Sequence, residues 1–368
     1  MKYLLFLYKT VKYLSYLNVL NKDFSYFAPM QKKTLFYFFL FITTLASAQI
    51  GGRYTYQFLN LISSPRQAAL GGKVITNYDK DVTQALFNPA SINYRMDNHL
   101  SLNYVNYLGD VNYGSASYAY TWDRRVQTFH AGVTYVSYGQ FDGYDEQGNE
   151  TGSFTGNEIA LSMGYAYNIP WTDIHIGANA KFINSKLEQY NSFGGALDLG
   201  IMYINEELEL NIALAARNLG VQFTTYAGVQ EQLPFELILG ISQKLEHVPI
   251  RWHLTFENLQ QWNIAFANPN RAEQSIEGGV TEEKVTFLKN LIRHTIVGME
   301  LFPDKGFNIR LGYNFRRGEE LKIVDQRNFS GITAGFGLKI NKLKFDYTYA
   351  RYSVAANTSM FGVTVNLQ

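Results

Sequence analysis

Residues 332–349 read ITAGFGLKINKLKFDYTY, two runs of alternating side chains separated by a short turn at Asn341. Side chains in a β-strand alternate between the two faces of the sheet, so a period of two predicts a hairpin with unlike faces. One face here is apolar, and the other carries polar residues such as Lys344, Asp346 and Thr348. The stretch therefore predicts two antiparallel strands with one apolar and one polar face.

The same period of two runs through residues 98–368 and gives about fourteen strands. Their apolar faces comprise 100–104, 118–122, 129–135, 159–167, 174–182, 197–203, 208–214, 235–241, 250–256, 295–301, 307–315, 332–340, 343–349 and 361–367. Strands that are apolar outside and polar inside are typical of a transmembrane β-barrel. A soluble β-sandwich shows the same alternation, so this pattern alone leaves both folds open.

The connections between these segments alternate in length. Short connections lie near 123–125, 169–172, 205–207, 246–249, 303–306 and 341; long ones lie near 139–156, 184–193, 218–233, 258–291 and 316–330. Outer-membrane barrels have short periplasmic turns and long outer loops, whereas a sandwich predicts no such alternation. The fold class that we predict is all-β: a transmembrane antiparallel β-barrel of about 14 strands.

Composition agrees with a barrel and argues against nucleic acid as a partner. The chain has 27 Tyr and 26 Phe, yet its mean hydropathy is only −0.16, a mixture that a barrel in outer-membrane lipid produces naturally. Six of the 32 basic and one of the 31 acidic residues lie in 1–48. The remaining 26 and 30 give a net charge of −4. No basic nucleic-acid-binding pattern accompanies that balance.

Residues 1–48 are predicted to be a leader. From Met30, the sequence MQKKTLFYFFLFITTLASAQ has the basic start, short apolar run and A-x-A site of a secretory signal peptide, here at 30–48. Residues 1–29 are either an over-extended start or an upstream anchor helix. The chain contains no Cys, which excludes disulfides and thiol chemistry. We therefore expect export and integration into a bacterial outer membrane.

Residues 49–97 break the strand pattern and are predicted to form a hatch within the barrel formed by 98–368. This stretch contains Gly71 and Gly72, the steps Ser64-Pro65 and Asn88-Pro89, and a candidate short helix over 81–87. Pro cannot donate a ladder hydrogen bond, and it disfavours helical geometry in the residue before it, so each of these steps is a turn or a stop. An ordinary folded N-terminal cap is the alternative.

No catalytic set, metal site or cofactor site emerges from the sequence. The six His (His99, His130, His175, His247, His253 and His294) show no ligand spacing, and no nucleophile-elbow, zinc-protease or phosphate-loop motif occurs. Asp142, Asp145 and Glu146 in the loop 141–152 could hold Ca²⁺, but they lack the EF-hand order. We expect a solvated loop there, no cofactor and no enzyme activity.

One long connection carries a candidate site for a partner. Val285, Leu288 and Leu291 (with Ile292) fit one face of a short amphipathic helix at the end of the connection 258–291. That face either packs on the barrel rim or binds a partner. The inward Lys344, Asp346 and Arg310 are expected to form salt bridges in the lumen.

The phrases RYTYQFLNLISSPRQAALGG (53–72) and ALFNPAS (85–91) resemble the hatch of the FadL-like outer-membrane barrels. Within that group the chain from about residue 51 onward is most similar to the PorQ barrels of the type IX secretion system of Bacteroidetes, and less closely to the PorV barrels. The resemblance implies a non-enzymatic barrel that anchors a surface protein of the PorZ kind, beside a PorU–PorV sortase complex. It supplies no catalytic residues.

Two other functions remain open. A FadL-like transporter would carry hydrophobic small molecules and would need an apolar pocket beside the hatch and an opening in the wall. An outer-membrane lipase would need a Ser and a His close together, which the sequence cannot place.

Overall fold

The computed structural model describes residues 54–123, 126–265, 273–274, 280–281, 285–321, 330–352 and 357–368. The chain divides into a unit of residues 1–49 and a unit of residues 50–368, and only the second contains described residues. The predicted leader (1–48), with its signal peptide at 30–48 and its start at 1–29, lies outside the described residues. So does the beginning of the predicted hatch, at 49–53.

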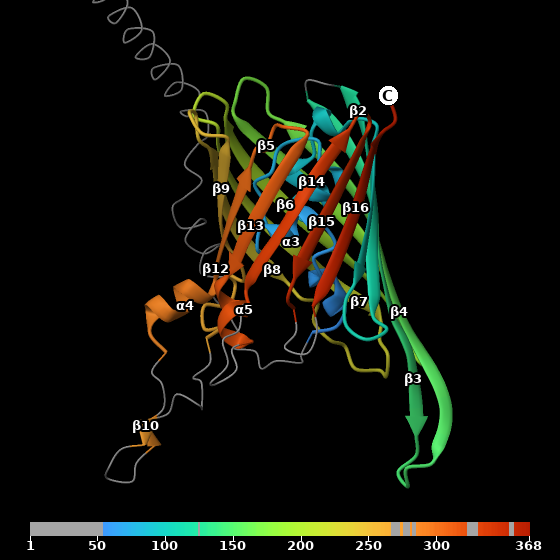
Figure 1. The fold of residues 1–368 in the computed structure, drawn as a ribbon. Helices are drawn as coiled ribbons and strands as arrows, with labels where there is room; N and C mark the ends of the chain where they lie inside the picture. The colour runs from blue at the N-terminus through green and yellow to red at the C-terminus, as the bar shows by residue number, and fades with distance from the viewer. Residues whose placement is uncertain are drawn as a thin grey trace, which may run out of the picture. The chain divides into compact units, whose positions relative to one another are not determined.

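Fourteen antiparallel strands close into one barrel, which confirms the predicted fold class (Figure 1). The strands are β1 His99–Asn106, β2 Asn112–Asp123, β3 Gln127–Tyr144, β4 Glu150–Asn168, β5 Ile174–Leu187, β6 Tyr190–Asn205, β7 Leu210–Thr224, β8 Glu236–Lys244, β9 Ile250–Phe256, β12 Thr295–Leu301, β13 Phe307–Asn314, β14 Ile332–Ile340, β15 Leu343–Ala350 and β16 Thr358–Asn366. Each of the fourteen predicted segments overlaps one of them, although Leu208, Phe235, Phe315 and Leu367 at segment ends lie outside the strands. β10 (Glu273–Gln274) and β11 (Val280–Thr281) form a separate two-stranded sheet.

The first and last strands close the barrel. β1 pairs with β16 over eight residues, from His99 opposite Asn366 to Asn106 opposite Ser359. Closure matters because an unpaired backbone N–H or C=O costs several kcal/mol in hydrocarbon, and a closed barrel has no edge strand. Among the described residues no helix has the length and apolarity needed to cross a membrane.

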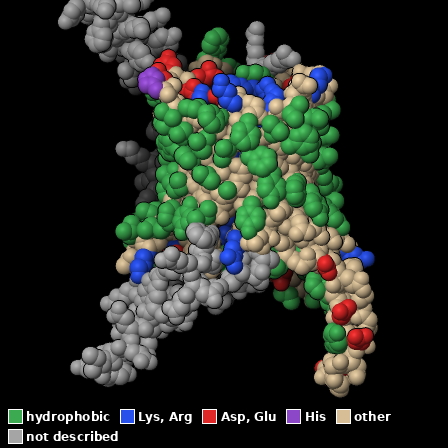
Figure 2. All heavy atoms as spheres, in the orientation of Figure 1, with side chains coloured by type: hydrophobic (Ala, Val, Ile, Leu, Met, Phe, Trp, Pro, Cys, Tyr) green, Lys and Arg blue, Asp and Glu red, His purple; other side chains and the backbone are tan. Residues whose placement is uncertain are grey.

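The two faces of the wall differ as the alternation predicts. Outward side chains such as Met163 and Leu102 are 63% and 53% exposed, while inward Asn179 and Thr348 are fully buried. On the face in view, Figure 2 shows the outward side chains as an apolar belt across the barrel, with charged side chains gathered beyond its upper edge. Such a belt is the surface that a barrel presents to lipid.

Long and short connections segregate to opposite ends of the barrel. The short turns lie at one end, named here the short-turn end. The β3–β4 turn, β10 and the two short helices α4 (Phe287–Arg293) and α5 (Phe315–Glu320) lie at the other, the long-connection end (Figure 1). By the rule for outer-membrane barrels the long-connection end faces outward.

Three of the predicted long loops are wrong in extent, because their polar residues continue the ladder. β3 and β4 pair as far as Tyr144 opposite Glu150, β5 and β6 meet at Leu187 opposite Tyr190, and β7 reaches Thr224. A hairpin in water can expose both faces, so these extensions lack the one-sided apolar pattern that identifies strands within the belt.

Residues 54–97 lie inside the barrel as a chain of short helices (Figure 1). In order these are η2 Gln57–Asn60, α3 Pro65–Ala69, η3 Val82–Leu86, η4 Pro89–Ser91 and η5 Tyr94–Met96. The side chains of Ser64, Asp81, Asn88 and Asn93 cap four of them by accepting hydrogen bonds from backbone amides. We refer to residues 54–97 as the hatch.

The hatch spans the lumen from the long-connection end to the short-turn end. Its first described residue, Tyr54, bridges to Gln232 in the β7–β8 connection. At its other end, Asp97 accepts a hydrogen bond of 2.8 Å from the side chain of Gln368, at the C-terminus. The described hatch therefore begins at the outward end, rather than entering from the periplasmic end as its position after a leader suggests.

Candidate functional site

Glycines of the wall let the hatch backbone approach the strands. A Cβ added at Gly312 of β13 would lie 2.0 Å from the amide N of Gly71 and 2.1 Å from the carbonyl C of Leu70. Gly71 itself has φ +97°, which disfavours any residue with a Cβ. Other wall glycines in close contact with the hatch are Gly132, Gly164, Gly194, Gly240, Gly298 and Gly335. The predicted motif residues Gly71 and Gly72 thus lie where α3 ends against β12 and β13.

Asn88 and Pro89 form a second contact with the wall. The Asn88 side chain accepts from Ala90 N at 3.0 Å and donates to Ile75 O at 2.8 Å, which joins two hatch segments. A Cβ at Gly177 would lie 2.3 Å from the carbonyl C of Pro89, and one at Gly200 would lie 2.2 Å from Asn88 Oδ1. The two predicted halves of the hatch motif therefore contact different parts of the wall.

A first ionic cluster fixes α3 to the wall. Arg66 donates from Nε and Nη2 to both carboxylate oxygens of Glu300, at 3.1 and 3.0 Å, and also pairs with Asp79. Arg310 lies 2.9 Å from Glu300 and 2.6 Å from Asp346, and Lys344 lies 3.3 Å from Asp346. The predicted lumen salt bridges of Arg310, Lys344 and Asp346 are present.

A second cluster lies around Glu236 of β8. Lys73 of the hatch is 2.7 Å from the Glu236 carboxylate, and Arg217 of β7 is 3.0 Å from it. All three side chains are buried. Losing one partner of a buried pair costs about 3–5 kcal/mol, because the other charge is left without a counterion. Lys73 therefore secures the middle of the hatch to the wall.

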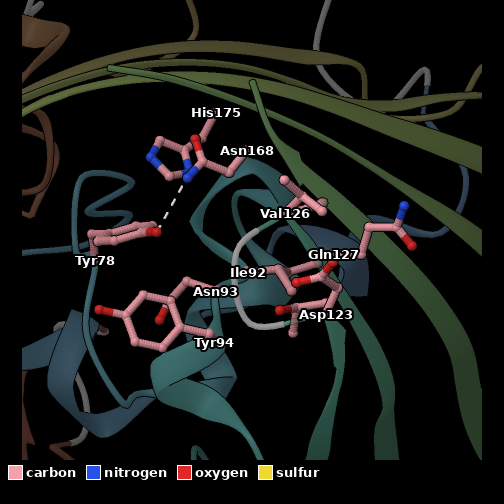
Figure 3. Close-up of a pocket in the computed structure, with 11 residues that line it drawn as sticks. Tyr78, Ile92, Asn93, Tyr94, Asp123, Val126, Gln127, Asn168 and His175 are labelled. Atoms are coloured by element: carbon pink, nitrogen blue, oxygen red, sulfur yellow. Dashed lines mark hydrogen bonds between the residues drawn. The ribbon is translucent and has the colours of Figure 1, made fainter. Parts of the chain in front are cut away.

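Two cavities between the hatch and the wall are each about the size of one water molecule. The cavity in Figure 3 has a volume of about 20 Å³, and the Tyr78 hydroxyl lies 3.4 Å from His175 Nδ1 at its edge. A second cavity of about 20 Å³ lies among Phe58, Leu86 and Phe87. Both are well below the roughly 300 Å³ at which ligand pockets begin.

Two buried histidines have contacts that suit structural roles, whereas both ring nitrogens of His130 are buried without a hydrogen-bond partner among the described residues. His253 lies 3.4 Å from Thr76 Oγ1, and His294 contacts the backbone carbonyls of Glu257 and Trp262. In the described ranges no histidine forms a hydrogen bond with a Ser hydroxyl. Within the same ranges, no group of three His, Cys, Asp or Glu is placed to hold a metal ion.

Asp145, the central residue of the Ca²⁺ alternative, caps the β3–β4 turn. Its carboxylate accepts from Gln147 N at 3.0 Å, Asn149 N at 2.7 Å and Asn149 Nδ2 at 2.9 Å. These hydrogen bonds, above all the one from the Asn149 side chain, lower the pKa of Asp145. Asp142 and Glu146 are exposed. The carboxylate is thus already committed to the turn.

The predicted amphipathic helix is present as α4, at the long-connection end, but it begins only at Phe287, so the predicted Val285 precedes the helix. Val285 and Leu288 are exposed, whereas Leu291 is half-buried. Phe287, which the predicted face omits, is 70% exposed although one side of its ring stacks on Trp262 at 4.8 Å. Arg293 lies 3.7 Å from Glu319 of α5. The helix therefore rests on the rim and leaves an apolar face uncovered.

Sequence reasoning missed the whole second cluster and the helix partner of α4, which is α5. Glu236 occupies an inward position of β8, where an acid next to apolar neighbours is a usable signal. α5 begins after Asn314, whose side chain accepts from Arg317 N at 2.9 Å. That N-cap was the available signal for α5.

No family model matches the chain, and no curated protein matches it. Among solved structures the chain is similar to the toluene transporter TbuX of Ralstonia pickettii, with 13% identity, a TM-score of 0.50, and coverage of 83% of this chain and 97% of that one. It is also similar to a FadL homologue of Pseudomonas aeruginosa, with 10% identity, a TM-score of 0.44, and coverage of 83% and 98%. At this identity the likeness to TbuX shows the fold alone: a closed antiparallel β-barrel.

Proposed function

We propose that this chain is a non-enzymatic outer-membrane barrel that anchors a protein partner at the cell surface through its long-connection end. The sequence resemblance to the type IX secretion barrels supports a PorZ-like partner, beside a PorU–PorV-like sortase complex. The observation that carries the proposal is the filled lumen: the hatch occupies it, and buried ion pairs tie the hatch to the wall. In a barrel filled in this way, the rim is accessible to a binding partner and the interior is not.

The most prominent feature of that rim is a two-stranded ribbon of residues 138–155, named here the arm. β2 pairs with β3 only as far as Ser137, and β5 pairs with β4 only from Gly156. Apart from a hydrogen bond from Glu188 N to Thr155 O at its base, the backbone of the arm therefore pairs only with itself within the described part of the chain. Figure 1 shows β3 and β4 continuing well past the other strands. Exposed backbone and side chains on a projecting ribbon suit recognition of another protein.

An aromatic pair gives the arm an apolar contact surface. Phe141 and Phe154 stack with ring centroids 5.4 Å apart and are 43% and 38% exposed, and Tyr144 is 58% exposed. Aromatic side chains supply much of the energy of protein interfaces. Together with the uncovered face of α4, the arm gives the long-connection end two apolar surfaces beyond the belt.

Replacing Phe141 and Phe154 by alanine is expected to release the surface partner into the medium. The variant Phe141→Ala/Phe154→Ala removes the aromatic pair, while Asp142→Ala/Ser153→Ala changes the next opposed pair of the ladder and serves as the matched control. The measurement is the fraction of surface protein shed into the medium by cells that carry each variant. Equal barrel levels in the outer membrane show that both variants fold.

A second variant deletes most of the arm by joining Gln140 to Thr155 through a two-residue turn. Anchoring through the arm would be contradicted if neither this variant nor the aromatic substitutions changed the retention of the partner at the surface. Gln140 and Thr155 lie opposite each other in the ladder, so the shortened hairpin keeps its register.

Transport of hydrophobic small molecules is the second candidate, and the comparison with TbuX favours it over anchoring. TbuX is a toluene transporter, and its fold is that of this chain. A transport route requires an apolar pocket beside the hatch. The cavity among Phe58, Leu86 and Phe87 has the right position, but Lys181 and Arg217 also line it, and its volume of about 20 Å³ is too small for such a solute. The filled lumen is the reason that we place anchoring first.

A further inference from the structure

A cavity lies at the short-turn end, opposite the arm. It has a volume of about 320 Å³ and lies between hatch residues 79–81, the β12–β13 turn and the β14–β15 turn. Its floor is the first ionic cluster, with Arg66, Glu300 and Arg310. We refer to this cavity as the mouth.

The acidic residues that line the mouth are already neutralised. Asp79 and Glu300 pair with Arg66, and Asp81 lies 3.6 Å from the same guanidinium. Asp304 pairs with Lys244 at 2.9 Å. Each carboxylate of the lining therefore has a cation beside it.

Four lysines of the mouth have no such partner. Lys80 of the hatch, Lys305 of the β12–β13 turn, and Lys339 and Lys342 beside the β14–β15 turn all line the cavity and are exposed. In the described ranges none of these four ammonium groups takes part in an ion pair or a side-chain hydrogen bond. Four like charges around one opening repel one another, and an anion placed among them relieves that repulsion.

We propose that the mouth binds a carboxylate-rich peptide segment of a protein on the short-turn side of the membrane. The lysines come from the hatch and from two separate turns, so several spaced carboxylates match them better than one small anion does. The volume is at the lower limit of ligand pockets, about 300 Å³, and so admits a few side chains rather than a folded domain.

The position of Lys80 distinguishes this site from a lipid-binding rim. Lys80 belongs to the hatch, and the inward-facing Asn308 and Thr364 line the same cavity. The mouth therefore opens along the barrel axis into water, whereas phospholipid headgroups surround the outside of the wall. A ligand that contacts Lys80 together with Lys339 has to enter the lumen opening.

The test uses the full chain in detergent micelles and a fluorescent octaglutamate peptide as probe, with octaglutamine as the neutral control. The variant Lys339→Gln/Lys342→Gln removes two mouth charges. Lys186→Gln/Lys289→Gln removes two exposed charges from the long-connection end and is the matched control. Fluorescence anisotropy gives the dissociation constant for each protein at two salt concentrations.

We expect the mouth variant to bind octaglutamate about tenfold more weakly than wild type, since a tenfold change is about 1.4 kcal/mol and two solvent-exposed ion pairs supply that much. The control variant should bind like wild type, and binding should weaken with salt, because the Debye length falls from about 10 Å at 0.1 M to about 3 Å at 1 M. Adding Lys80→Gln and Lys305→Gln should abolish binding.

Two outcomes would overturn the proposal. One is equal weakening by the two double variants, which would mean that the peptide senses overall charge only. The other is peptide binding that is insensitive to the mouth lysines while vesicles of phosphatidylglycerol bind through them, which would assign the lysines to the membrane. Neither outcome affects the proposed anchoring, which depends on the opposite end.

Discussion

Placing leucine at Gly312 is expected to displace the hatch and convert a closed barrel into a conducting one. The Cβ alone would overlap the backbone of Leu70 and Gly71, at 2.1 and 2.0 Å, so the end of α3 has to leave the wall. The barrel keeps its ladder there, since Gly312 pairs with its neighbours through backbone atoms only. Planar-bilayer recordings should show ion conductance for the variant and a baseline for wild type.

Gly306 provides the matched control for this substitution. It lies just before β13, and a Cβ added there would have the Lys339 carbonyl oxygen as its nearest neighbour, at 3.5 Å, an ordinary contact. Gly306→Leu should therefore remain closed. The contradicting result is a folded Gly312→Leu protein whose conductance stays at baseline and whose hatch resists protease as well as the wild-type hatch does. It would show that the hatch does not depend on this contact.

Removing the Glu236 carboxylate is expected to give a large loss of stability. Glu236→Ala leaves Lys73 and Arg217 buried together without their shared counterion. We expect a loss of about 3–5 kcal/mol in the free energy of unfolding, measured by urea titration in detergent micelles. The exposed pair of Glu209 with Lys244 supplies the control, because Glu209→Ala should cost only about 0–1 kcal/mol.

Rescue distinguishes a charge effect from a packing effect at the same site. The double variant Lys73→Met/Glu236→Gln removes one of the two cations, while Arg217 keeps its hydrogen bond of 3.1 Å to Leu59 O. It should recover part of the lost stability. The ionic role of this cluster would be contradicted if Glu236→Ala lowered the free energy of unfolding no more than Glu209→Ala does, and if the double variant were no more stable than Glu236→Ala.

The sequence was sufficient for the barrel because the belt imposes one rule on each strand. Residues such as Phe336 and Met163 face lipid, and their neighbours face the lumen, so a period of two identifies each strand without knowledge of its partners. The rule applies only at membrane depth. The arm extends into water and follows no such rule, so its polar sequence predicts a loop where the structure has a ribbon.

The lumen was predicted less completely because its contacts join residues far apart in the chain. Gly71, Asn88 and Pro89 stand out locally as turn residues, and the structure places all three against wall glycines. Arg66 and Glu300, however, are 234 residues apart, and nothing near either residue in the sequence identifies the other. The path of the hatch, and the unpaired lysines of the mouth, likewise follow only from the closed barrel.

The central claim is that the lumen carries no solute and that the protein acts through its surface. Its most direct test is the uptake of radiolabelled toluene and of a long-chain fatty acid by cells with and without the wild-type protein. A filled lumen predicts the same uptake rate for both solutes in both strains. The contradicting result is faster uptake of either solute in cells that contain the protein, together with loss of that increase in the variant Ala160→Phe, whose new side chain fills the cavity beside Phe58 and Phe87. That result would establish transport.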